Sequence, residues 1–192
     1  MKAIFLIPTL FLVPLAASAG VVLSEIDLAG NRVELINTGG SAADLTGWWW
    51  CNRVNGSPFY ALVTSNSTVD AGLSSPGATL TNFGAGQVMV LDLTSGFLPD
   101  ANGELGLYTT NSFGSASAIH DYVLWGGSGI RDLTAQNAGI WIDNDSISVA
   151  GLGAGDTIQL KPGLPGNSAA DYEIAPSTLG AEQVAAPVEL AI

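Results

Sequence analysis

The chain has 192 residues, of which 11% are charged, and 17 Asp and Glu residues outnumber 5 Lys and Arg residues to give a formal net charge of -12. This length fits one domain, or a small pair, and allows a sizeable hydrophobic core. The low charge content, together with 24 Gly and 9 Pro residues, excludes a coiled coil. The negative field argues against nucleic acid or an anionic membrane as a partner.

The first 19 residues have the pattern of a secretory signal peptide. A positive start at Lys2 precedes an apolar run over 3–16 and the small residues 17–19, after which signal peptidases cut. The run is shorter than the roughly 20 apolar residues of a membrane-spanning helix, although an uncleaved anchor is the alternative. We expect a mature chain from Gly20, with net charge -13 after loss of Lys2, that is secreted or periplasmic and does not insert into a membrane.

From residue 21 onward, short runs of Val, Ile, Leu, Trp and Tyr alternate with turn residues at roughly the spacing of an all-β domain. Residues 21–26 and 32–36 predict a hairpin in which Val33 and Leu35 face the core while Arg32 and Glu34 face solvent. Further strands are predicted at 44–52, 59–63, 87–93, 104–109, 119–125, 139–142 and 157–161, and a long surface loop at 65–76.

This many strands predict a sandwich of two antiparallel sheets, because stacking buries one face of each strand and leaves few edges. A β-barrel is the competing architecture. We expect one domain over residues 20–183, followed by a C-terminal tail at 184–192 that is too short to anchor in a bilayer.

Several segments resemble a lamin tail domain in order and spacing. The opening is carried by VVLSEI at 21–26, VELINTG at 33–39 and ADLTGW at 43–48, which resemble a strand ending in Glu-Ile, the family's VELYN strand and its DLSGW turn. GELGLY at 103–108 resembles the family's GELRLY-like strand, and DYVLWG at 121–126 resembles its VDYVTYG strand.

The ending PSTLGAEQ at 176–183 is similar to the family's PTPGAAN, from which Leu179 and Gln183 depart. Segments 64–76 and 130–148 are then insertions.

The resemblance implies an immunoglobulin-like β-sandwich. For exported bacterial members it implies a non-catalytic module for adhesion, scaffolding or substrate contact. The nuclear-filament role of other members does not transfer, because this chain has no coiled-coil rod.

Consecutive tryptophans in the third predicted strand divide between two faces, because side chains alternate along a strand. Trp48 and Trp50 share one face, and Trp49, Cys51 and Arg53 share the other. An exposed Trp49 would give an aromatic platform for sugar rings or a partner chain, whereas a loop packed over Trp49 is the alternative. Trp49 and Arg53 are our candidate binding residues.

Cys51 is the single cysteine, so the chain forms no internal disulfide. On the outer face of an exported protein, an unpaired cysteine is a candidate for an intermolecular disulfide. A buried, inert thiol is the alternative, since free cysteine is among the most buried residue types.

Catalytic patterns are missing from the sequence. His120 is the single histidine, which excludes a multi-histidine zinc or copper site. No Gly-x-Ser-x-Gly turn marks a nucleophile. A hydrolase would require Cys51, His120 and Asp121 to converge. We therefore predict that the chain is not an enzyme.

Two acidic turns offer oxygen atoms that suit calcium. One contains Asp143 and Asp145, and the other contains Asp100, Asn102 and Glu104. Neither matches an EF-hand loop, and ordinary solvated turns are the alternative. The sequence predicts no cofactor beyond a weak calcium site at one of these turns.

Together these features predict an exported, non-catalytic binding or structural module that contacts a protein or polysaccharide at the cell surface. The alternative is a carbohydrate-binding accessory module with Trp49 in its platform. Self-association is a further expectation, because few lysines are available to block pairing between exposed edge strands.

Overall fold

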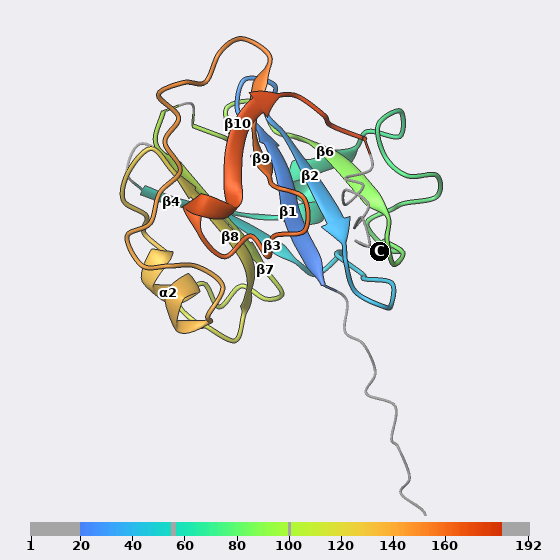
Figure 1. Ribbon diagram of the computed structural model, residues 1–192. Coiled ribbons are helices and arrows are strands. Elements are labelled where there is room, and N and C mark those ends of the chain that lie inside the picture. The colour runs from blue at the N-terminus through green and yellow to red at the C-terminus, as the bar shows by residue number, and fades with distance from the viewer. Residues whose placement is uncertain (1–19, 55–56, 100, 182–192) are drawn as a thin grey trace, which may run out of the picture.

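The computed structural model describes residues 20–54, 57–99 and 101–181, and they form two stacked antiparallel sheets (Figure 1). The predicted signal peptide, Asp100 and the predicted tail lie outside the described residues. The larger sheet has six strands in the order β10 (Tyr172–Pro176), β9 (Asp156–Leu160), β1 (Val21–Asp27), β2 (Arg32–Asn37), β6 (Val88–Leu93) and β5 (Ser67–Val69). The smaller sheet has four, in the order β4 (Ser57–Leu62), β3 (Trp49–Val54), β7 (Gly103–Tyr108) and β8 (Ile119–Trp125).

A continuous apolar core lies between the sheets. In the larger sheet, strand register places Leu35 opposite Leu23 and Met89, so these side chains share one face. In the smaller sheet, Trp50 lies opposite Leu107. All five side chains are fully buried. The predicted antiparallel β-sandwich is therefore confirmed, and the barrel alternative is wrong because both sheets stay open.

The first predicted hairpin is confirmed by the pairing of β1 with β2. Its turn contains Asn31 at φ 53°, a left-handed conformation that Asn tolerates better than most residues. Glu34 of β2 alternates with Val33 and Leu35 as predicted, yet it is fully buried instead of facing solvent. That prediction is wrong because residues 177–180 cover this face, and the amide of Gly180 donates to Glu34 Oε2 at 2.7 Å.

The remaining sequence predictions differ from the structure at four places. The strand predicted at 44–52 begins only at Trp49, because Asp44 Oδ1 accepts from the amide and hydroxyl of Thr46 and so stabilises a turn before the strand. The predicted strand at 139–142 is a turn that follows helix α2 (Asp132–Asn137), and the predicted loop at 65–76 instead contains the end of α1 (Val63–Asn66) and edge strand β5. Strand β10 was not predicted, and it follows the 3-10 helix η1 (Ala169–Asp171). The apolar run at 139–142 is explained by Trp141, which packs edge-on against Tyr122 at 5.6 Å between ring centroids.

Candidate binding sites

Trp49 and Cys51 share the outer face of the smaller sheet, as strand alternation predicts, because they lie opposite Tyr108 and Gly106. Residues 109–118 lie over part of this face through Phe113. That ring stacks on Tyr60 at 3.9 Å and meets Trp49 edge-on at 5.9 Å. Trp49 is consequently half-buried, and its ring does not stand free as a platform.

Cys51 is 0% exposed, so the structure agrees with the buried-thiol alternative and not with a thiol that is accessible on the outer face. Burial raises the pKa of this thiol to about 12, with a further rise from Glu104 and an opposing effect from the Arg131 guanidinium. A neutral, enclosed thiol is a poor nucleophile and is not presented to a second chain. An intermolecular disulfide would require this part of the fold to open.

Glu104, a predicted calcium ligand, instead anchors the segment that covers Cys51. It is fully buried in β7, and its Oε2 accepts hydrogen bonds from the Tyr122 hydroxyl at 2.7 Å and from the amides of Ile130 and Arg131 at 2.6 and 3.0 Å. Its role in the structure is to tie the start of the α2 segment to the smaller sheet.

Two of the other predicted calcium ligands, Asn102 and Asp145, are also held by protein groups. Asn102 Oδ1 accepts from Arg53 Nη1 at 2.9 Å, and Arg53 also donates to the carbonyl of Ser128. Asp145 Oδ2 accepts from the amide of Ala169 at 2.7 Å, and Asp143 is half-buried. Across the described residues, no three His, Cys, Asp or Glu side chains are grouped to hold a metal. The calcium site stays a prediction.

His120 and Cys51 contact different residues. His120 Nε2 accepts from the amide of Val21 at 3.2 Å, and its ring lies 4.6 Å from that of Trp48. Burial lowers the pKa of His120. The thiol lies in β3, which β7 separates from β8, so the two backbones are about 10 Å apart.

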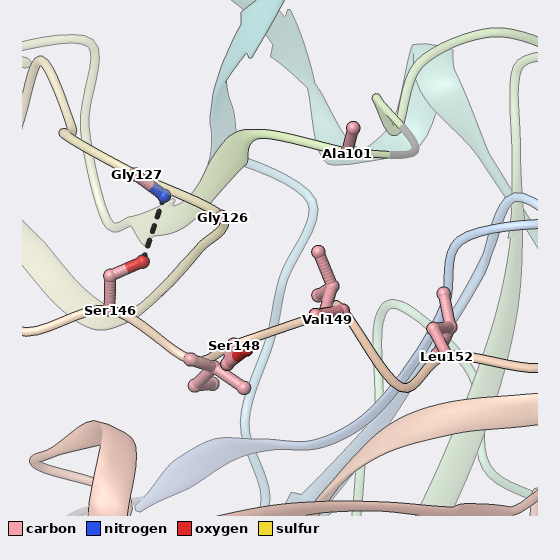
Figure 2. Close-up of a pocket in the computed structure, with 9 residues that line it drawn as sticks. Ala101, Gly126, Gly127, Ser146, Ser148, Val149 and Leu152 are labelled. Atoms are coloured by element: carbon pink, nitrogen blue, oxygen red, sulfur yellow. Dashed lines mark hydrogen bonds between the residues drawn. The ribbon is translucent and has the colours of Figure 1, made fainter.

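An open groove of about 690 Å³ lies beside the end of β8 (Figure 2). One wall is the bend at Gly126, whose φ is 72° and where a Cβ would overlap the carbonyl oxygen of Ala101. The facing wall is held by hydrogen bonds from Gly126 N to Ile147 O at 2.9 Å and from Gly127 N to Ser146 Oγ at 3.0 Å. Its lining is uncharged and consists of Ala101, Gly126, Gly127, Ser146, Ile147, Ser148, Val149, Ala150 and Leu152.

A second, smaller recess of about 210 Å³ lies next to Phe59. Phe59 is 52% exposed, and it meets Phe97 nearly at right angles, with 5.8 Å between the ring centroids. Asn66 also lines the recess, is 8% exposed, and has no hydrogen-bond partner for its buried Nδ2 among the described residues. The remaining lining comes from residues 94–96.

One loop contributes to both hollows, because residues 94–97 line the recess and Ala101 lines the groove. Hydrogen bonds attach this loop to the smaller sheet on two sides. Asn52 Nδ2 donates to the carbonyl of Phe97, and Trp125 Nε1 donates to that of Pro99 at 3.0 Å. The two hollows therefore lie toward the same end of the sandwich.

Neither hollow was predicted from the sequence. The groove is lined largely by backbone and small side chains, so it depends on which loops meet rather than on a motif. The only indication in the sequence that Phe59 is exposed is a weak one, namely its position directly after Pro58 at the start of a strand. Four large apolar side chains are exposed in the described part of the chain, namely Phe59, Leu133, Ile142 and Leu164, and of these Phe59 alone is aromatic.

Comparisons with protein-family models, with curated proteins and with solved structures find no match to this chain. Within the residues that the structure describes, no helix has the length and apolar character needed to cross a bilayer.

Proposed function

We propose that the chain is an exported, non-catalytic binding module of the lamin-tail type, which holds a partner protein at the loop end of its sandwich. The observation that carries this proposal is the open, uncharged groove beside the end of β8. A concave site of this size, with hydrogen-bonding groups among apolar ones, is the usual setting for binding.

The family assignment is supported by where the resembling segments fall. The first two coincide with β1 and β2, the third leads directly into β3, and the later two match β7 and the end of β8. Residues 177–181 of the PSTLGAEQ segment follow β10 and include Gly180, whose amide donates to Glu34. Each of these motifs therefore lies on a strand of the sandwich or directly beside one.

The lining of the groove favours a neutral, extended segment as its ligand. An extended chain can exchange hydrogen bonds with backbone groups at the groove, while Ile147, Val149 and Leu152 supply apolar contacts. The overall charge of -12 would repel an acidic segment. We therefore expect a neutral or basic stretch of a cell-surface protein.

The test is binding of the labelled mature chain to the envelope of its source cells. Ser148 is exposed and lines the groove, so Ser148→Trp fills the site without touching the core. The matched control is Ser112→Trp, at an exposed position between β7 and β8. We expect binding at least tenfold weaker for Ser148→Trp and unchanged for Ser112→Trp. Equal binding by both variants, or no binding by the wild type, would contradict the proposal.

Carbohydrate binding is the second candidate function, and the observation that favours it is the exposed ring of Phe59 beside its recess. Trp49 is a weaker choice for the sugar platform because Phe113 packs against it. A carbohydrate module would use the Phe59 side of the shared loop, whereas a protein-binding module would use the groove.

A further inference from the structure

We infer that the recess formed by Phe59, Phe97 and Asn66 is a binding site for one neutral pyranose ring. This inference rests on the carbohydrate candidate under the proposed function, and it names the ligand class and the residues that would hold it. It concerns a different hollow from the groove, so the two sites can be tested separately.

The shape of the recess suits a flat, partly apolar ligand. Phe59 is 52% exposed and rests edge-on against the buried Phe97 at an interplanar angle of 77°, so Phe59 supplies the ring that a ligand can contact. The axial C–H groups of a pyranose ring form an apolar patch that packs on such a ring. The recess volume of about 210 Å³ accommodates one sugar ring, but not a long apolar chain.

Asn66 is the reason to expect a ligand with hydrogen-bonding groups. Leaving a buried amide hydrogen without an acceptor is unfavourable because its lost hydration is not replaced, and Nδ2 of Asn66 is in this position within the described structure. Asn66 lines the recess, and a turn of its side chain would let Nδ2, which is shielded from solvent, donate to a sugar hydroxyl there. The nearby hydroxyl groups of Thr94 and Ser95 line the same recess and can exchange further hydrogen bonds with a polyhydroxylated ligand.

The charge of the site selects a neutral sugar. The lining residues Phe59, Asn66, Thr94, Ser95, Gly96 and Phe97 carry no ionisable group. An anionic sugar acid would therefore find no cation in the lining and would be repelled by the net charge of -12. The same neutral ring could come from a polysaccharide or from the glycan of a glycoprotein.

The experiment is calorimetric titration of the mature chain with defined probes. These are neutral hexasaccharides of glucose, N-acetylglucosamine, mannose and xylose, a mannose-bearing glycoprotein, and polygalacturonate as the anionic comparison. We expect at least one neutral probe to bind with Kd of about 1 mM or tighter, as a single-ring site allows. Whether the free oligosaccharides or the glycoprotein bind distinguishes the two sources of the ring.

Variants identify the site. Phe59→Ala removes an exposed side chain and should weaken binding about tenfold, whereas Leu164→Ala, at an exposed apolar residue that does not line the recess, should leave binding unchanged. In wild-type protein labelled with 15N at asparagine, the Asn66 side-chain amide resonance should shift on binding. No neutral binding, binding that Phe59→Ala leaves intact, an unshifted Asn66 resonance, or preference for polygalacturonate would overturn the inference.

The groove variant separates this inference from the proposed protein-binding function. Ser148→Trp should leave the sugar titration unchanged, because Ser148 does not line the recess. Loss of envelope binding in Ser148→Trp with intact sugar binding supports both proposals. Intact envelope binding in that variant would contradict the proposal that the groove binds a partner protein. The inference about the recess is tested by the sugar titration alone.

Discussion

Asp121 connects the two sheets through a single buried side chain. It belongs to β8 of the smaller sheet, and its Oδ2 accepts from the amide of Leu23 in β1 of the larger sheet at 2.6 Å. Strand β9 pairs with β1 only at Glu25 and Ile26, so the first half of β1 lacks a neighbour on that side. Because buried backbone amides need acceptors, His120 and Asp121 take the place of the missing strand there.

Burial gives Asp121 a pH-dependent effect on stability. It raises the pKa of this carboxyl from its ordinary value of 3.8 to about 7, against the lowering effect of hydrogen bonds from the amides of Leu23 and Tyr122. The folded chain therefore holds a proton that the unfolded chain releases between pH 4 and pH 7. Stability from this group is fully present below pH 4 and is lost as pH rises through 7.

We predict that Asp121→Asn removes this loss. Between pH 4 and pH 8, the unfolding free energy of the wild type should fall relative to that of the variant by on the order of 4 kcal/mol, the equivalent of about three pKa units. Urea unfolding at each pH measures the difference. His120 acts in the opposite sense, since its lowered pKa removes stability as pH falls below 6.5, but it is present in both proteins. Parallel pH profiles would contradict the prediction.

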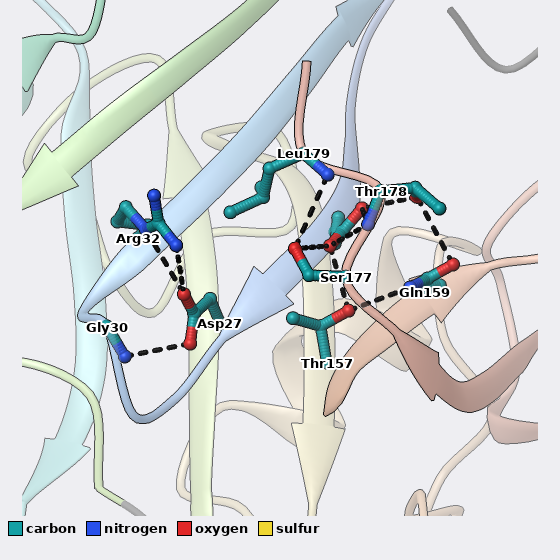
Figure 3. A network of polar contacts seen from close by, with 9 residues as sticks. Asp27, Gly30, Arg32, Thr157, Gln159, Ser177, Thr178 and Leu179 are labelled. Carbon is teal, nitrogen blue, oxygen red and sulfur yellow. Dashed lines mark hydrogen bonds and ion pairs between the residues drawn. The ribbon is translucent and has the colours of Figure 1, made fainter. Parts of the chain in front are cut away.

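Buried carboxylates on β1 and β2 hold the segment that follows β10. Figure 3 shows Ser177 and Thr178 of this segment in a polar network with Thr157 and Gln159 of β9. Glu25 Oε1 accepts from the hydroxyls of Thr157 and Ser177 at 2.8 and 2.9 Å, and Glu25 Oε2 accepts from the Thr178 hydroxyl at 2.7 Å. Burial raises the pKa of Glu34, partly offset by hydrogen bonds from Ser24 and Gly180. The segment that covers this face of the larger sheet is therefore held by hydrogen bonds to buried carboxylates rather than by apolar packing.

Gly180 is the position in this segment that tolerates a side chain least. Its φ is 81°, and an added Cβ would lie 2.5 Å from the carbonyl oxygen of Leu73. Gly163→Ala is a matched control, because Gly163 has φ 77° and open space around its Cβ position. We predict a loss of about 1 kcal/mol for Gly163→Ala from backbone strain, and of about 3 kcal/mol for Gly180→Ala, where overlap adds to the strain. Chemical denaturation measures both, and equal losses would argue against a close approach to Leu73.

At the scale of the whole molecule, the sequence predicted the sandwich because strand alternation and turn residues are local signals. The same alternation correctly put Cys51 and Glu34 on faces opposite the core, but it could not reveal what covers those faces. Cys51 is covered by residues around Arg131, and Glu34 by Gly180, which is 146 positions away along the chain. The recess at Phe59 was missed for the same reason, since Asn66 and Phe97 reach it only through the tertiary fold.

The charge balance of the whole chain leads to a final prediction. The net charge is -12, and the described residues contain one ion pair, Arg32 with Asp27 at 2.8 Å. Repulsion among the remaining acidic groups should therefore outweigh attraction at pH 7. Screening from 0.02 to 0.5 M NaCl should raise the free energy of unfolding by about 1 kcal/mol, because the screening length falls well below the size of the domain.

The pH dependence of this salt effect tests its cause. Near pH 4, close to the isoelectric point of about 4.1, net repulsion disappears and the stabilisation by salt should disappear with it. KCl should act like NaCl, since screening depends on ionic strength and not on the identity of the cation. Thermal unfolding at both pH values measures the effect. Destabilisation by salt at pH 7 would mean that attractive pairs, and not repulsion, dominate the electrostatics of the folded chain.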